Sequence, residues 1–191
     1  MRYFDLSDDT GALHRWHIGE VRDETGHEPR LKSGSHMATT GPLLAKVHYD
    51  GPALEFCLTS LSVPVTTKRL AAVMVNLAGG DLQVIPLQVI TPRASSVERV
   101  VLNAIRKIRC LDEDRSKFTK WTVNDHRADL AGQYRQVTKL VVNPTAIPPD
   151  VHIFRIEGWE VALIVSETLK NAMEQAGCHG AVFQDVTPPL H

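Results

Sequence analysis

Residues 162–183 read ALIVSETLKNAMEQAGCHGAVF, a helix pattern between two strand patterns. The apolar run 162–165 has the length of a buried strand. Ser166 follows it and is a residue type that caps helices, because its hydroxyl can accept from the free N–H groups of the first turn. Apolar side chains then recur at the spacing of one helical face, at Leu169, Ala172, Met173 and Ala176. Gly177 can adopt the left-handed backbone that ends a helix, and 181–183 resume a strand pattern.

An earlier segment repeats this order of patterns. A strand-length apolar run precedes Thr67, a suitable cap, and the same helical spacing leads to two consecutive glycines and a strand pattern over 82–89. Pro86 cannot donate to a ladder, so we expect this strand at a sheet edge or with a bulge. Two short capped helices are therefore predicted, at about 67–78 and 166–176. An internal duplication could explain the similarity, but we favour a recurrent strand–helix–strand solution to packing.

Most of the remaining chain has strand patterns joined by turn residues. Residues 3–6 predict a first strand. Residues 43–49 and 53–58 flank an Asp-Gly-Pro turn and predict a hairpin, while 134–142 predicts a strand whose partner is 152–156. The predicted fold is α+β, with a mixed or antiparallel sheet and the two helices packed on it.

Two segments are less regular. Residues 7–42 are rich in Asp, Gly, His, Ser and Thr, and predict a long, irregular N-terminal loop arm anchored by Trp16 and Ile18. Residues 97–108 fit a helical face by spacing, whereas their β-branched content favours a strand. A chain of 191 residues forms one domain or two small ones, and we expect a single domain over 1–191.

Composition indicates a globular protein without the character of a polyanion binder. The hydrophobic fraction of 43% and the charged fraction of 23% are ordinary for a soluble domain. The 21 Lys and Arg balance 22 Asp and Glu, and the densest basic cluster is only Arg106, Lys107 and Arg109. Nucleic-acid modules usually carry a larger basic footprint, so we expect no nucleic-acid partner.

Cysteine usage and hydropathy favour a cytoplasmic location. Cys57, Cys110 and Cys178 are far apart and in apolar settings, which suits reduced thiols better than a disulfide framework. No apolar segment follows a basic start, so we expect no signal peptide. The longest apolar runs are far shorter than the roughly 20 residues that span a bilayer, and we expect no membrane association.

The candidate catalytic and metal-binding groupings are weak. His14 and His17 have a metal-ligand spacing but no nearby cysteine, and the run Asp112–Asp114 lacks the alternation and the glycine of a calcium loop. Asp125–His126 could form an oriented general base, yet no nucleophile elbow accompanies it. We therefore expect no enzyme activity, no metal and no cofactor.

A chain without an active site commonly acts through a binding surface. Trp121 lies between polar neighbours and close to acidic residues, and tryptophan is enriched at binding hot spots. The alternative is that Trp121 packs against the core. The predicted contact residues are Asp112, Glu113, Asp114, Trp121, Asp125 and Asp129.

Three pieces of sequence carry a family resemblance: LNAIRKIRCLDEDRSKF at 102–118, HIFRIEG at 152–158, and LIVSETLKNAME at 163–174 with the later GAVF. Together they resemble the eleventh immunity-protein family of bacterial polymorphic toxin systems. The pieces span roughly 60–186, and the arm before Pro42 matches only loosely. The resemblance favours a strand at 97–108. Residues that fall where the family pattern expects them are Asn103, Asp112, Ser116, Phe154, Arg155, Ser166 and Glu167.

The resemblance implies a protein that protects its producer and kin by binding a cognate toxin encoded by the neighbouring gene. Such toxins are often nucleases, and binding would cover the active site or hold the toxin inactive. A net charge of −1 provides no strongly acidic surface, so only the local acidic patch around Trp121 would attract a basic nuclease. The competing functions are a hydrolase or transferase that uses Asp125 and His126, and an adaptor with a different partner.

Overall fold

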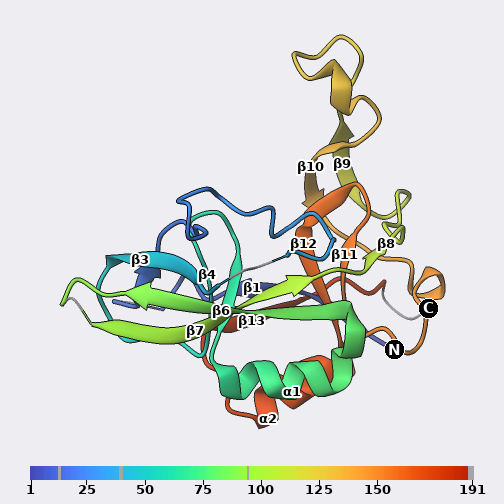
Figure 1. The fold of residues 1–191 in the computed structure, drawn as a ribbon. Helices are drawn as coiled ribbons and strands as arrows, with labels where there is room; N and C mark the ends of the chain where they lie inside the picture. The colour runs from blue at the N-terminus through green and yellow to red at the C-terminus, as the bar shows by residue number, and fades with distance from the viewer. Residues whose placement is uncertain (13, 39–40, 94, 189–191) are drawn as a thin grey trace.

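The computed structural model describes residues 1–12, 14–38, 41–93 and 95–188. A six-stranded sheet, a five-stranded sheet and a separate two-stranded hairpin hold most of its residues. Two α-helices pack on each other along one side of the sheets (Figure 1). The fold is α+β, as the sequence predicts.

In chain order the described strands are β1 (Tyr3–Asp8), β2 (His17–Ile18), β3 (Leu43–Tyr49), β4 (Phe56–Leu58), β5 (Pro64–Thr66), β6 (Leu82–Ile90), β7 (Ser96–Ala104), β8 (Lys107–Ile108), β9 (Lys117–Lys120), β10 (Tyr134–Lys139), β11 (Ile153–Ile156), β12 (Trp159–Ser166) and β13 (Ala181–Asp185). The described α-helices are α1 (Lys68–Ala78) and α2 (Glu167–Gln175).

Both predicted helices and both predicted caps are confirmed. The Thr67 hydroxyl accepts from the backbone N–H of Leu70 at 3.3 Å, and the Ser166 hydroxyl accepts from that of Leu169 at 3.2 Å. Gly177 has a φ of 72°, the left-handed conformation expected after α2. The predicted apolar faces are buried, including Leu70, Met74, Leu169 and Met173.

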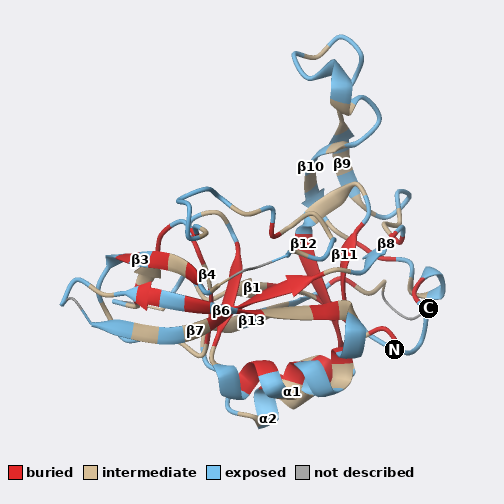
Figure 2. Cartoon of the chain, in the orientation of Figure 1, coloured by how far each residue is buried: buried red, intermediate tan, exposed pale blue. Residues whose placement is uncertain are grey.

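The two large sheets nearly join into one. Their strand orders are β2-β3-β6-β7-β5-β4 and β13-β1-β12-β11-β8. On one side the chain runs from β7 directly into β8 of the other sheet, and on the other side the Phe56 N–H of β4 donates to the His179 carbonyl just before β13. The central core therefore contains side chains from both sheets and both helices, and Figure 2 shows the buried sides of the helices turned towards the strands.

The two halves of this core have the same topology. In one half β4 and β5 form a hairpin, α1 crosses over, and β6 returns on the far side of β7. In the other half β11 and β12 form the hairpin, α2 crosses over, and β13 returns on the far side of β1. All of these ladders are antiparallel. The central strand β1 comes from the N-terminal end of the chain, whereas β7 follows β6 directly.

The pairing registers of the halves also match. Thr66 and Pro86 both pair with Val100 of β7, and the residues 99 positions later, Val165 and Asp185, both pair with Phe4 of β1. The same separation of 99 residues relates the helix caps and the buried helical positions, Thr67 with Ser166, Leu70 with Leu169, and Met74 with Met173. A recurrent packing solution does not require a constant separation over a strand, a helix and a second strand. We therefore favour an internal duplication.

Two predicted strand pairs are wrong. The strand at 43–49 pairs with β2 and β6 instead of with 53–58, because β4 pairs with β5. The strand at 134–142 pairs only with β9 among the described strands, and 152–156 supplies β11, which lies between β12 and β8. Burial separates the two members of the second pair. β11 is buried throughout and needs a central place, whereas β10 has no buried residue.

The spacing of residues 97–108 suggested a helix, and this interpretation is wrong. The segment forms β7 and β8, as the family resemblance favours. Residues 100–104 are all buried because both faces of β7 are covered, so the apolar run is continuous and does not alternate. Pro86 pairs with Val100 of β7, but pairing of β6 with β3 begins only at Leu87. No strand on the β3 side therefore requires an N–H group at this position.

The predicted N-terminal loop arm over 7–42 is not confirmed. Trp16, Ile18, Val21 and Leu31 are buried in a second core on the six-stranded sheet. Within the segment β2 pairs with β3, and Trp16, the predicted anchor, packs beneath the guanidinium of Arg99 with 4.9 Å between its carbon and the ring centroid. The polar composition conceals a few widely spaced apolar residues that are sufficient to attach the segment to the sheet.

Arg155 and Asp5 are ionisable residues of the five-stranded sheet whose pKa values are shifted by burial. Arg155 is wholly buried, and its Nη1 donates to the Glu160 carbonyl at 2.7 Å. Burial lowers the pKa of Arg155 to about 10, so the guanidinium remains protonated at neutral pH. Burial also raises the pKa of Asp5 to about 6, against the opposing effects of the Leu163 N–H and the charge of Arg155. The Asp5 carboxylate is therefore less stable in the folded protein than in the unfolded chain.

Replacing Asp5 with asparagine tests this electrostatic cost. The folded-state pKa of about 6 lies above the ordinary 3.8, so the stability that the protonated acid contributes is present below the ordinary value and lost as pH rises through about 6. Asp5→Asn carries no charge at any pH and keeps the accepting oxygen. We expect its free energy of unfolding in urea to exceed that of the wild type by roughly 1–3 kcal/mol at pH 7.5 and to equal it near pH 3.5. A difference that does not vary with pH would contradict the assignment.

The two helix caps give a second prediction. Thr67→Ala and Ser166→Ala each leave an N–H group of a first turn without its acceptor, and each should lower the free energy of unfolding by about 1 kcal/mol. Thr168→Ala is the matched control, because Thr168 is an exposed residue inside α2. Equal stability of the cap variants and this control, measured by urea denaturation, would show that the caps do not matter.

Candidate protein-binding site

The β9–β10 hairpin stands away from the two sheets (Figure 1). Its strands pair only with each other among the described strands. None of the thirty residues 111–140 is buried, and Figure 2 shows the hairpin without a buried segment. In the sequence the hairpin lies between β7 and β11, and neither of its strands belongs to the elements that the two halves share. Leu111 and Leu140 at its ends pack against a core while only partly buried. The strands between them add no buried side chain, and projecting segments of this kind commonly carry function.

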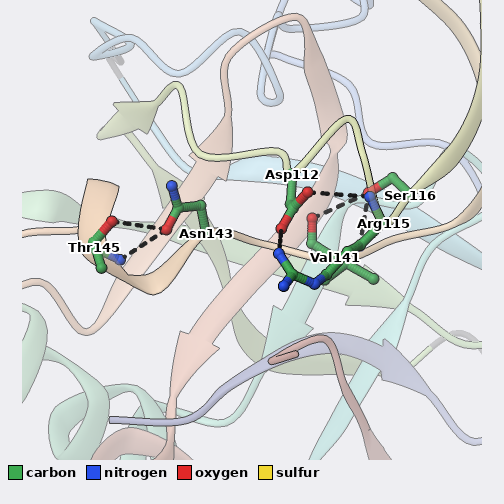
Figure 3. A network of polar contacts seen from close by, with 6 residues as sticks. All are labelled: Asp112, Arg115, Ser116, Val141, Asn143 and Thr145. Carbon is green, nitrogen blue, oxygen red and sulfur yellow. Dashed lines mark hydrogen bonds and ion pairs between the residues drawn. The ribbon is translucent and has the colours of Figure 1, made fainter. Parts of the chain in front are cut away.

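Hydrogen bonds fix the base of the hairpin (Figure 3). The Asp112 carboxylate accepts from the Arg115 backbone N–H at 3.1 Å and from its guanidinium at 2.9 Å. The Ser116 hydroxyl donates to the Val141 carbonyl at 3.1 Å and accepts from the Val141 N–H at 3.0 Å. The Asp112 N–H donates to the same carbonyl at 2.9 Å. The bond from Arg115 is the main reason that the pKa of Asp112 is lowered, so this carboxylate acts as a structural acceptor.

The inner face of the hairpin packs towards the body. The rings of Phe118 and Tyr134 meet edge to face with centroids 5.1 Å apart, and Lys120 lies over both. Glu113 accepts from the Tyr134 hydroxyl at 2.5 Å and from the Lys120 ammonium at 2.7 Å. Burial, and then the bond to Glu113, raise the pKa of Tyr134 to about 12. A Cβ at Gly158 would be 3.4 Å from the Tyr134 ring, so the β11–β12 turn supports the hairpin closely.

Trp121 begins the tip of the hairpin and packs on tip residues instead of on the core. Its ring meets that of His126 edge to face at 5.3 Å, and the Arg135 guanidinium carbon lies 4.8 Å from its centroid. Asp125 accepts from the Thr122 N–H at 2.7 Å and pairs with Arg135 at 3.1 Å. The tip is therefore an ordered cluster around an incompletely buried tryptophan.

All six predicted contact residues lie on the hairpin or at its base. Asp112, Glu113 and Asp114 lie at the base, and Trp121, Asp125 and Asp129 lie at the tip. Four of the five carboxylates are paired with a cation of the same segment: Asp112 with Arg115, Glu113 with Lys120, Asp125 with Arg135, and Asp129 with Arg127. Asp114 has no ion pair with a residue that the structure describes. Residues 111–140 contain six Lys and Arg against five Asp and Glu, so the segment has no net negative charge.

Sequence reasoning did not predict the basic partners of these carboxylates. Arg115 and Arg127 are close in sequence to the carboxylates they pair with, and that spacing could have identified them. Arg135 approaches Asp125 and Trp121 only because β10 folds back along β9. This second relation depends on strand register, which spacing does not reveal.

The other groupings singled out in the sequence do not form reactive sites. Among the described residues no group of three His, Cys, Asp or Glu side chains is placed to hold a metal ion. Asp125 is bound by Thr122 and Arg135, while the His126 ring packs on Trp121, so the two are not aligned as an acid–base pair. Burial raises the pKa values of the Cys57 and Cys110 thiols to about 12. No helix in the described part of the chain has the length and apolar character to cross a bilayer.

The family model described as Immunity protein family (Imm11) matches residues 27–188. The matched range contains both helices, the hairpin and most of the two sheets. No curated protein matches the chain.

The bonds at the hairpin base give a testable prediction. Asp112→Ala removes both acceptors of Arg115, so local opening of the base should become easier by about 1 kcal/mol. Trypsin should then cleave within residues 115–139 about five-fold faster under native conditions, because cleavage follows the population of the open form. Asp114→Ala is the control and should be cleaved at the wild-type rate. Equal cleavage of both variants would show that Asp112 does not hold the hairpin.

Proposed function

The chain belongs to the Imm11 immunity protein family, and we propose that it binds and neutralises a cognate protein toxin in interbacterial competition or kin discrimination. The proposal places the protein in the cytoplasm, where it forms a stoichiometric complex with a toxin of nuclease activity encoded by the neighbouring gene. It assigns no catalytic step to the chain itself.

One observation carries the proposed binding site. The β9–β10 hairpin extends from the body without contributing a buried residue, and it presents Trp121 at its tip. Tryptophan and arginine are the residue types most enriched at binding hot spots, and Arg135 lies against the Trp121 ring. We propose that the toxin contacts this hairpin through the predicted residues Asp112, Glu113, Asp114, Trp121, Asp125 and Asp129.

The hairpin is suited to inhibition because its shape is held before the toxin arrives. The bonds at Asp112 and Ser116 fix its base, and the contact of Tyr134 with Gly158 supports its inner face. A preformed element loses little conformational freedom on binding, so more of the contact energy remains as affinity. A projecting two-stranded element can also enter a concave site. We propose that inhibition occurs by covering the active site of the toxin.

Two other functions receive less support. A hydrolase or transferase based on Asp125 and His126 would need the two side chains aligned, whereas Arg135 and Trp121 engage them separately. An adaptor with a different partner would use the same hairpin. Only the identity of the partner would distinguish an adaptor from an immunity protein, so the decisive measurement uses the product of the neighbouring gene.

Co-expression with that product tests the proposal. The wild-type protein should restore growth of cells that make the toxin and should purify with it in a defined ratio. Trp121→Ala should weaken the complex by about 30-fold or more, since hot-spot residues cost at least about 2 kcal/mol. Tyr49→Ala is the matched control, because Tyr49 is an exposed aromatic residue of β3, outside the hairpin.

The outcomes separate the parts of the proposal. A complex that survives Trp121→Ala unchanged would exclude the hairpin tip as the contact. Failure of the wild-type protein to bind the toxin or to protect cells would overturn the immunity function itself. Binding of the toxin without protection of the cells would contradict inhibition by covering the active site.

A further inference from the structure

The hairpin has two chemically different faces. In the β9–β10 ladder Lys117 pairs with Lys139, and Thr119 pairs with Gln136. Paired residues point to the same side of a sheet, and all four of these side chains are exposed. The alternate residues form the half-buried inner face, which includes Phe118, Lys120, Tyr134 and Val137. The outer face is therefore the side turned away from the protein body.

Two lysines oppose each other directly on this outer face. Like charges at directly opposed positions destabilise a strand pair, because their Cβ atoms are only about 4.5–5.5 Å apart. Neither Lys117 nor Lys139 has an ion pair with a residue that the structure describes. The other cations of the hairpin, namely Arg115, Lys120, Arg127 and Arg135, each have a carboxylate partner. The Lys117–Lys139 repulsion thus remains uncompensated within the described chain.

Trp121 and Arg135 extend the same face towards the tip. Trp121 is two residues beyond Thr119, so strand alternation places it on the side of Lys117. Arg135 occupies a register shift between Tyr134 and Gln136, and its guanidinium lies over the Trp121 ring. We call Lys117, Lys139, Trp121 and Arg135 the outer stripe. It combines three cations with one large aromatic ring on an exposed surface.

We propose that the outer stripe docks on an acidic surface of the protein partner. This inference rests on the proposed function, so the partner is the toxin. Carboxylates of the toxin would neutralise Lys117 and Lys139 and remove their mutual repulsion, while Trp121 and Arg135 supply the central contact. The carboxylates of the hairpin keep their partners and hold its shape. Within the hairpin contact proposed above, the cations then carry the electrostatic attraction to the toxin, and the paired carboxylates hold them in place.

The charge of the stripe also limits where it binds. The groove of a nuclease that holds phosphates is basic, so it would repel Lys117 and Lys139. On a nuclease toxin the stripe would therefore occupy an acidic region beside that groove, and the tip would reach over the active site. A nucleic acid is the less favoured partner. Cations and aromatic rings do form such sites, but the whole chain has a net charge of −1 and lacks a wide basic footprint.

Charge reversal tests the stripe. Lys117→Glu/Lys139→Glu should weaken toxin binding by about 30-fold or more, since close interfacial charge pairs commonly contribute that much. The control is Lys46→Glu/Arg93→Glu, the same change of charge at exposed positions of β3 and the β6–β7 turn, which should bind within about three-fold of the wild type. Affinities would be measured by calorimetry at 50 and 300 mM NaCl. Salt should weaken the wild-type complex and should not weaken the reversed one.

A single reversal separates folding from binding. Lys117→Glu alone places a carboxylate opposite Lys139 and turns a repulsive pair into an attractive one. Its melting temperature should equal or exceed that of the wild type, although its toxin affinity falls. Loss of affinity with an unchanged or higher melting temperature cannot result from misfolding.

Each remaining outcome overturns a different statement. If both double variants bind the toxin and protect cells as the wild type does, the stripe is wrong and the immunity function stands. If the wild type itself neither binds nor protects, the proposed function is wrong. If a single-stranded 20-mer DNA or RNA binds the wild type more tightly than the toxin does, and binding is lost in Lys117→Glu/Lys139→Glu, the partner is a nucleic acid instead.

Discussion

Packing of α1 and α2 against both sheets is the constraint on which the rest of the structure depends. Leu70, Met74, Leu169 and Met173 are buried in one core with side chains of both sheets. Because the helices share this core, neither half can bury its apolar surface alone. The two halves have the same topology and matching registers, so the same arrangement of hairpin, helix and returning strand occurs twice. The strand β1, near the N-terminus, completes the second half. Each sheet then covers its outer face with additional segments, such as the one anchored by Trp16.

In this arrangement the β9–β10 hairpin contributes no buried residue to the cores. The bonds of Asp112 and Ser116 to Val141 tie its two ends together, while its strands pair only with each other in the described structure. A core that is complete without the hairpin allows the hairpin to change in sequence without loss of stability. For a protein that must match one particular toxin, this separation of scaffold and contact is physically useful.

Charge on the hairpin has two separate roles. Carboxylates that accept from neighbouring N–H groups and cations are structural, because their hydrogen bonds hold turns in place, as Asp112 and Asp125 do. The Lys117–Lys139 pair does the opposite, because it raises the energy of the isolated hairpin. The sequence does not show which carboxylates are paired with cations of the same segment. It therefore predicts an acidic patch, whereas the folded segment has a slight excess of cations.

The sequence alone determined the local elements and the family. Helix caps, apolar faces and strand-length runs depend on neighbours within a few residues, so Thr67, Ser166 and Gly177 could be assigned correctly. The six residues chosen as contacts also identified the segment that projects from the body. Only the tertiary structure decided the strand partners of β3 and β10, the extended conformation of 97–108 and the attachment of 7–42. Those features depend on which distant residues cover a strand and on the register of pairing. The local spacing of residues determines neither of them.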